Sequence, residues 1–354
     1  MIFVVLAHFI GWGTTHNGVG EITVSFENGG LNAWIFPFIT PLSAMGVICF
    51  ILISSYFICD NNILRFERIF KVWFQTVFYS VLLAFVSSRF IPVSGKEIIK
   101  SFFPLWSNEY WFVTKYIALV ILAPIFSIIV NSVSKKGMAI ILFALSSITV
   151  SITCNIPFGN SFFSDNPLSV ASFVLLFFIA AYIKRFGTSK WIEQNSGWIF
   201  IAGILIQGIG GIALNFIHDS SQVIYGGFSV GYNAFSIIPG TALFIWFKNH
   251  NFNENWLTRF LVFLAPYTFA VYLIHDNAYF RTILWNKIID PALYWQSPVW
   301  IILMITVPIA ILLICCAVDI LRKHIFRLFK FDSLVERIKQ YNIAIQTDNG
   351  VNQK

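Results

Sequence analysis

Charged residues are scarce in this sequence. Asp, Glu, Lys and Arg make up 11% of its 354 residues, whereas about 25% is usual in soluble domains. This shortage excludes a soluble enzyme. The five cysteines lie in or beside apolar runs without metal-like spacing, which excludes a secreted disulfide scaffold and predicts that no metal is bound. No basic segment precedes the first apolar run, so the chain does not begin with a secretory signal.

Hydrophobic residues, in contrast, make up 57% of the chain. At roughly 20 residues per crossing, they suffice for about ten membrane spans. Because a helix satisfies its own backbone hydrogen bonds in lipid, we predict an all-α polytopic helical bundle. The first span is too short to cross a bilayer, and we expect that a segment upstream of it is missing. The predicted spans are residues 1–12, 34–59, 72–88, 110–131, 138–156, 169–185, 198–217, 233–247, 257–275 and 299–320.

Lys and Arg are unequally distributed between the two sets of loops. One set, with the C-terminal tail, holds 17 of them and the other holds five, which predicts a cytoplasmic C-terminus. The net charge of +7 therefore reflects membrane topology and does not indicate nucleic-acid binding. We predict a transmembrane domain at residues 1–320 and a basic cytoplasmic tail at 321–354. Basic and apolar residues alternate in this tail, which predicts a helix lying on the anionic inner leaflet.

Ionisable residues near the membrane are the first candidates for function. His8 lies in an apolar run, where it is either an interfacial histidine bonded to a carbonyl or a general base. Arg65, Arg68 and Lys71 follow the second span at steps of three residues and therefore share one helix face. Such a face suits phosphate groups, and a simple topology anchor is the alternative.

Two further stretches carry aromatic and polar side chains together. Tyr110 and Trp111 lie at the outer mouth of the fourth span, with Lys115 about one turn inside. Tyr272 and His275 share a helix face at the outer end of the ninth span. Aromatic faces beside hydrogen-bonding groups suit a sugar acceptor, although interfacial aromatic belts have the same composition. His275 either positions an acceptor or caps the helix end.

Taken in order, several stretches resemble the integral-membrane acyltransferase family 3, which includes bacterial enzymes that O-acetylate surface polysaccharides. The resemblance covers residues 1–321 and depends mainly on the order of its motifs. It implies a cytoplasmic membrane protein in which acetyl-CoA enters from the cytoplasm and the acetyl group reaches a surface glycan outside. The stretches are VVLAHF, GVICFILISSYF, the basic segment after it, EYWFVTKYIALVILAPIF and YTFAVYLIH.

The resemblance also implies roles for individual residues. His8 would act as the general base that takes the proton of a sugar hydroxyl, either in direct transfer or through an acyl-enzyme. The basic face would bind the phosphates of coenzyme A. The two aromatic stretches would line the acceptor path. These implied binding residues are Arg65, Arg68 and Lys71 for the donor, and Tyr110, Trp111, Lys115, Tyr272 and His275 for the acceptor.

The sequence departs from the family pattern at two places. An arginine is usual roughly ten residues before the histidine, and only seven residues precede His8; the glycine usual before Tyr56 is Ser55. The absent arginine keeps a second hypothesis open, namely a glycan exporter or flippase of the same fold without acyl transfer. Cations within several spans would be expected for transport of acidic glycans, and only Lys115 is clearly intramembrane.

Overall fold

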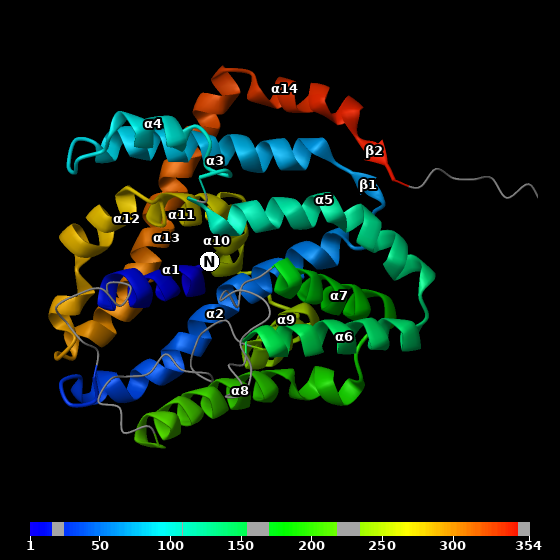
Figure 1. Ribbon diagram of the computed structural model, residues 1–354, viewed down its shortest axis with the longest axis horizontal. Coiled ribbons are helices and arrows are strands. Elements are labelled where there is room, and N and C mark those ends of the chain that lie inside the picture. The colour runs from blue at the N-terminus through cyan, green and yellow to red at the C-terminus, as the bar shows by residue number, and fades with distance from the viewer. Residues whose placement is uncertain (16–24, 108, 154–169, 218–233, 346–354) are drawn as a thin grey trace, which may run out of the picture.

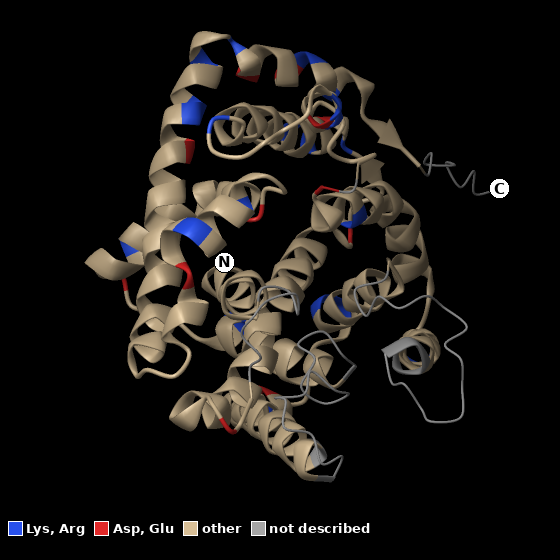
Figure 2. Ribbon diagram, turned by 60° about the vertical axis from the view of Figure 1, so that its left-hand side comes forward, with Lys and Arg blue, Asp and Glu red and all other residues tan. Residues whose placement is uncertain are grey.

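The computed structural model describes residues 1–15, 25–107, 109–153, 170–217 and 234–345 of the chain. The predicted span ends at Ile156, Ser169 and Asn233 lie outside these residues. Helices account for most of the described residues (Figure 1) and carry few charged residues (Figure 2), which confirms the all-α membrane bundle. Six of the described helical segments are long and apolar enough to cross a membrane.

Each of the ten predicted spans coincides with a helix or with consecutive helices. The first comprises α1 and the π-helical turn η1, and the ninth is divided into α10, η3 and α11. The helices are α1 (Ile2–His8), η1 (Phe9–Thr14), α2 (Gly30–Ile58), α3 (Phe66–Ser87), α4 (Gly95–Ser101), α5 (Trp111–Ser132), α6 (Lys135–Thr153), α7 (Val170–Phe186), α8 (Lys190–Ile217), α9 (Ala234–Asn249), α10 (Trp256–Leu264), η3 (Ala265–Tyr267), α11 (Thr268–His275), α12 (Phe280–Ile283), η4 (Leu284–Ile289), η5 (Pro291–Tyr294), α13 (Val299–Leu328), α14 (Phe331–Ile338) and η6 (Lys339–Tyr341).

Helix α2 is central in the bundle and packs against α1, α5, α7, α8 and α9. Its contact with α1 depends on Gly46, where a Cβ atom would lie 2.7 Å from Cγ2 and 2.8 Å from the backbone nitrogen of Val4. Only a residue without a side chain lets the two helices approach so closely. Gly46 thereby sets the position of α1, the helix that ends at His8.

A buried polar cluster joins α3 to α13. The carboxylate of Asp319, which is 0% exposed, accepts hydrogen bonds from the Tyr79 hydroxyl at 2.8 Å and from the Gln75 amide at 3.1 Å. The Arg322 guanidinium donates two further bonds, from Nε at 2.6 Å and from Nη2 at 3.1 Å. Because both charges are paired and hydrogen-bonded, the cluster can remain buried at this contact.

The C-terminal segment folds back onto the bundle. Helix α13 continues past the predicted domain boundary at residue 320 to Leu328, and α14 then runs along α3 (Figure 1). Val335 and Ile338 of α14 are buried there. These two apolar side chains are therefore covered by protein, whereas Leu334 of the same helix is exposed; contact of the tail with the lipid surface stays a prediction. The last described element is strand β2 (Ile343–Ala344), which is antiparallel to β1 (Ile63–Leu64).

Candidate functional site

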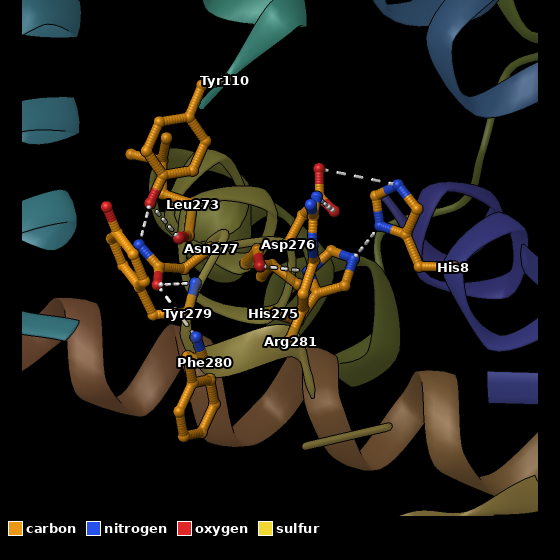
Figure 3. A network of polar contacts seen from close by, with 10 residues as sticks. His8, Tyr110, Leu273, His275, Asp276, Asn277, Tyr279, Phe280 and Arg281 are labelled. Carbon is orange, nitrogen blue, oxygen red and sulfur yellow. Dashed lines mark hydrogen bonds and ion pairs between the residues drawn. The ribbon is translucent and has the colours of Figure 1, made fainter. Parts of the chain in front are cut away.

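The two histidines singled out in the sequence meet where α1 and α11 end. Nδ1 of His8 lies 2.7 Å from Nε2 of His275, although the residues are 267 positions apart (Figure 3). His275 is fully buried, and its Nδ1 is hydrogen-bonded to the carbonyl oxygen of Val271 one turn earlier. The two rings thus form a chain that begins at a backbone carbonyl and ends at the outer nitrogen of His8.

This series of hydrogen bonds determines which nitrogen of His8 can accept a proton. A carbonyl oxygen only accepts hydrogen bonds, so Nδ1 of His275 carries the hydrogen and its Nε2 is the acceptor. His8 must then donate from Nδ1 to this acceptor. In the neutral pair, the lone pair of His8 is therefore on Nε2, which is the arrangement that a general base requires.

A carboxylate lies beside this nitrogen. Oδ2 of Asp276 is 3.8 Å from Nε2 of His8, too far for a hydrogen bond but within ion-pair distance once His8 is protonated. The other carboxylate oxygen lies 3.6 Å from Nη1 of Arg281. The guanidinium of Arg281 lies over the ring of Trp12, 3.9 Å from the ring centroid. Asp276 can therefore stabilise an imidazolium at His8. While His8 is neutral, Arg281 balances the negative charge of Asp276.

Asn277 holds the turn that carries Asp276 and Arg281. It is fully buried, and its Oδ1 accepts hydrogen bonds from the backbone of Tyr279 at 3.1 Å and of Phe280 at 3.0 Å. Its Nδ2 donates to the Tyr110 hydroxyl at 2.9 Å, and that hydroxyl donates to the carbonyl of Leu273, also at 2.9 Å (Figure 3). Oδ1 and Nδ2 of Asn277 and the hydroxyl of Tyr110 are thereby all hydrogen-bonded, so the turn is held firmly between the start of α5 and the end of α11.

A small apolar pocket adjoins His8. Among the described lining residues, the side chains with N–H or O–H groups are His8, Trp111 and Tyr272. An apolar wall with a few polar groups suits a small organic substrate whose reacting atoms must be kept from water. The remaining lining residues are Met1, Val4, Gly46, Val47, Phe50, Phe112 and Phe269.

A second small pocket lies where α3 begins. Arg65 and Arg68 line it, and the ion pairs between described residues do not include either of them. Two guanidinium groups without a protein carboxylate can bind phosphate oxygens. Lys71 is exposed on the same helix and does not line this pocket.

The two pockets lie along the same pair of helices. Phe50 and Phe112 line the His8 pocket, whereas Ile58 of α2 and Val120 of α5 line the arginine pocket. Each helix advances by about 12 Å between its two lining residues. A substrate with an anionic end and a long unbranched arm could therefore follow the contact between α2 and α5 from one pocket to the other.

The remaining residues predicted to bind the acceptor are placed differently. Tyr110 and His275 are both 0% exposed and are hydrogen-bonded to protein groups, so they support the site from behind and do not line the pocket. The ammonium of Lys115 lies over the ring of Trp111, 5.2 Å from its centroid. Of the five predicted acceptor residues, Trp111 and Tyr272 line the pocket together with His8.

The sequence analysis did not identify Asp276, Arg281, Asn277 or Trp12 as site residues. The sequence HDN contained a partial indication, because an acidic residue directly follows a histidine in a chain with few acidic residues. Of these three residues, only His275 was assigned a role, either positioning an acceptor or capping the helix end. Arg281 was counted as one of the outer-loop cations. Their association with His8 depends on contacts between distant segments.

A membrane helical bundle whose partly buried imidazole borders an apolar pocket defines a multi-pass membrane protein with a candidate site for proton transfer. A family model describing an acyltransferase domain matches residues 1–318. The chain therefore belongs to acyltransferase family 3, which confirms the resemblance seen in the sequence and makes the protein a membrane acyltransferase. No curated protein and no solved structure matches the chain significantly.

Proposed function

We propose that the protein transfers an acetyl group from acetyl-CoA to a hydroxyl of a surface glycan, in a bacterial cytoplasmic membrane with the C-terminus inside. The observation that carries the proposal is the position of His8. Its Nε2 is the free acceptor of a histidine pair and borders an apolar pocket. This geometry is what base catalysis on an attacking hydroxyl needs.

The donor would bind with its phosphates at Arg65 and Arg68 and with its pantetheine arm between α2 and α5. This route brings the thioester to the pocket beside His8. The acceptor oxygen attacks the thioester carbon while His8 takes its proton. Collapse of the tetrahedral intermediate breaks the carbon–sulfur bond, and His8 returns the proton to the leaving coenzyme A thiolate. Asp276 stabilises the imidazolium between these two steps.

The proposed role of His8 as the base is tested with the whole chain, in membranes of a host that acetylates its surface glycan. Radiolabel from acetyl-CoA is expected in ester linkage to the surface glycan, and His8→Ala should abolish the transfer. Undiminished transfer by His8→Ala would remove His8 from the mechanism. Measuring total surface polymer tests the exporter hypothesis, because loss of an exporter lowers the amount of polymer whereas loss of an acyltransferase lowers only its ester content.

The donor site is tested by comparing Arg68→Ala with Lys71→Ala, one turn further along α3. Both variants remove one positive charge, but only Arg68 lines the pocket. Arg68→Ala should raise the KM for acetyl-CoA about tenfold, as expected for the loss of a charge-assisted contact. Lys71→Ala should have a clearly smaller effect. Equal effects would show that net surface charge, and not this pocket, governs donor binding.

A further inference from the structure

Tyr272 combines deep burial with a hydroxyl whose O–H has no hydrogen-bond acceptor among the described residues, although the backbone N–H of Phe112 faces its oxygen. Its side chain is 4% exposed. A buried O–H without an acceptor is unfavourable, and a phenylalanine would pack equally well without this disadvantage. Such a group therefore indicates a partner that binds during function.

The neighbouring tyrosine shows the contrast. Tyr110 packs against Tyr272 with ring centroids 5.9 Å apart, and its hydroxyl is bonded to both Leu273 and Asn277. Only Tyr272 of this pair lines the pocket. In this aromatic cluster, the hydroxyl of Tyr110 is thus hydrogen-bonded within the protein, whereas the O–H of Tyr272 is available to a ligand in the His8 pocket.

Tyr272 is also close to the proposed base. Its ring centroid lies 6.4 Å from that of His8, and Phe112 packs edge-on against it at 5.7 Å. This aromatic packing fixes the ring, so the hydroxyl is preorganised and does not need to be ordered during the reaction. A thioester carbonyl in the pocket between the two side chains would be exposed to a proton acceptor and to a hydrogen-bond donor.

We propose that the Tyr272 hydroxyl donates a hydrogen bond to the thioester carbonyl oxygen and stabilises the negative charge that develops there. This assignment depends on the proposed function. When the acceptor oxygen bonds to the carbonyl carbon, the π electrons of the C=O bond move to the oxygen facing Tyr272, and the acceptor proton moves to His8. The electrons then re-form the C=O bond as the coenzyme A thiolate leaves. Tyr272 keeps its proton throughout and acts only as a donor.

The test uses Tyr272→Phe, which keeps the ring and its packing and removes only the hydroxyl. The full chain is assayed in host membranes with [1-14C]acetyl-CoA, beside wild type, His8→Ala and the control Tyr182→Phe on α7. Removing one donor to an oxyanion should lower kcat about 100-fold, with the KM for acetyl-CoA within about twofold of wild type. Tyr182→Phe, which is half-buried and outside the His8 pocket, should retain wild-type kcat.

A spectroscopic measurement separates hydrogen bonding from a general structural effect. In isotope-edited infrared spectra, the carbonyl stretch of bound [1-13C]acetyl-CoA should be lowered in wild type and in His8→Ala, and should return toward its free value in Tyr272→Phe. Wild-type kcat and an unchanged stretch in Tyr272→Phe, with His8→Ala inactive, would overturn the role of Tyr272 alone. Absence of acetyl transfer by the wild-type chain would overturn the proposed function itself.

Discussion

The side chain of Asn342 accepts a hydrogen bond from the backbone N–H of Phe66 at 2.9 Å, across 276 positions of the chain. Phe66 is the first residue of α3, and Arg65 before it makes no side-chain cap of its own. Asn342 thus supplies the capping acceptor from another segment. Together with the β1–β2 pairing, it holds the start of α3, where Arg65 and Arg68 line a pocket.

Asn342→Ala is therefore expected to weaken donor binding without affecting the chemical step. Loss of a cap costs about 1 kcal/mol, so the KM for acetyl-CoA should rise about threefold to fivefold. Steady-state titration with acetyl-CoA in membranes measures this change. Asn342→Asp, which keeps an acceptor oxygen, should restore most of the affinity. A kcat that falls while KM stays constant would contradict this role.

His275 is expected to be a positioning residue. Replacement by leucine removes the acceptor for Nδ1 of His8, and kcat should fall by about two orders of magnitude because the base is no longer held in one tautomer. In His275→Gln, the amide oxygen can still accept that hydrogen bond. We therefore expect kcat to decrease in the order wild type, His275→Gln, His275→Leu, at similar KM. If the two variants are equally impaired, the tautomer argument fails.

Gly46→Ala should push α1 away from α2, because the added Cβ would meet Val4 at 2.7 Å and 2.8 Å. Overpacking of this kind costs about 1–3 kcal/mol of stability. Activity should fall as well, since α1 carries His8. Gly11→Ala is a suitable control, because a Cβ there meets nothing within 4 Å. Thermal unfolding in detergent and acetyl transfer measure the two effects, and similar results for both variants would refute the packing argument.

Substitutions of Asp319 and Arg322 are expected to have non-additive effects on the melting temperature. Asp319→Leu leaves the guanidinium of Arg322 without its carboxylate, and removing one partner of a buried pair costs about 3–5 kcal/mol. The double variant Asp319→Leu/Arg322→Leu has no unpaired charge and should melt at a higher temperature than Asp319→Leu. It should remain below wild type, because Tyr79 and Gln75 also lose their acceptor. Melting temperatures that decrease additively would exclude this coupling.

The sequence predicted the helices well but the site only in part. Each span is a local property, because about 20 consecutive apolar residues are enough to define it, and all ten predicted spans coincide with helices. His8 and Tyr272 were recognised as candidates because polar groups stand out within apolar runs. Tyr110 and His275 were expected to face the acceptor, yet both are fully buried, since exposure depends on which helices pack around a residue.

What the sequence by itself determined was therefore the all-α membrane class, the order of the helices and the family. These follow from hydropathy and from the order of motifs along the chain. The tertiary structure alone decided that His8 lies beside His275 and Asp276, and that the C-terminal segment returns to α3. The physical reason is that these contacts join segments more than 260 positions apart, and close packing of the intervening helices determines which side chains meet.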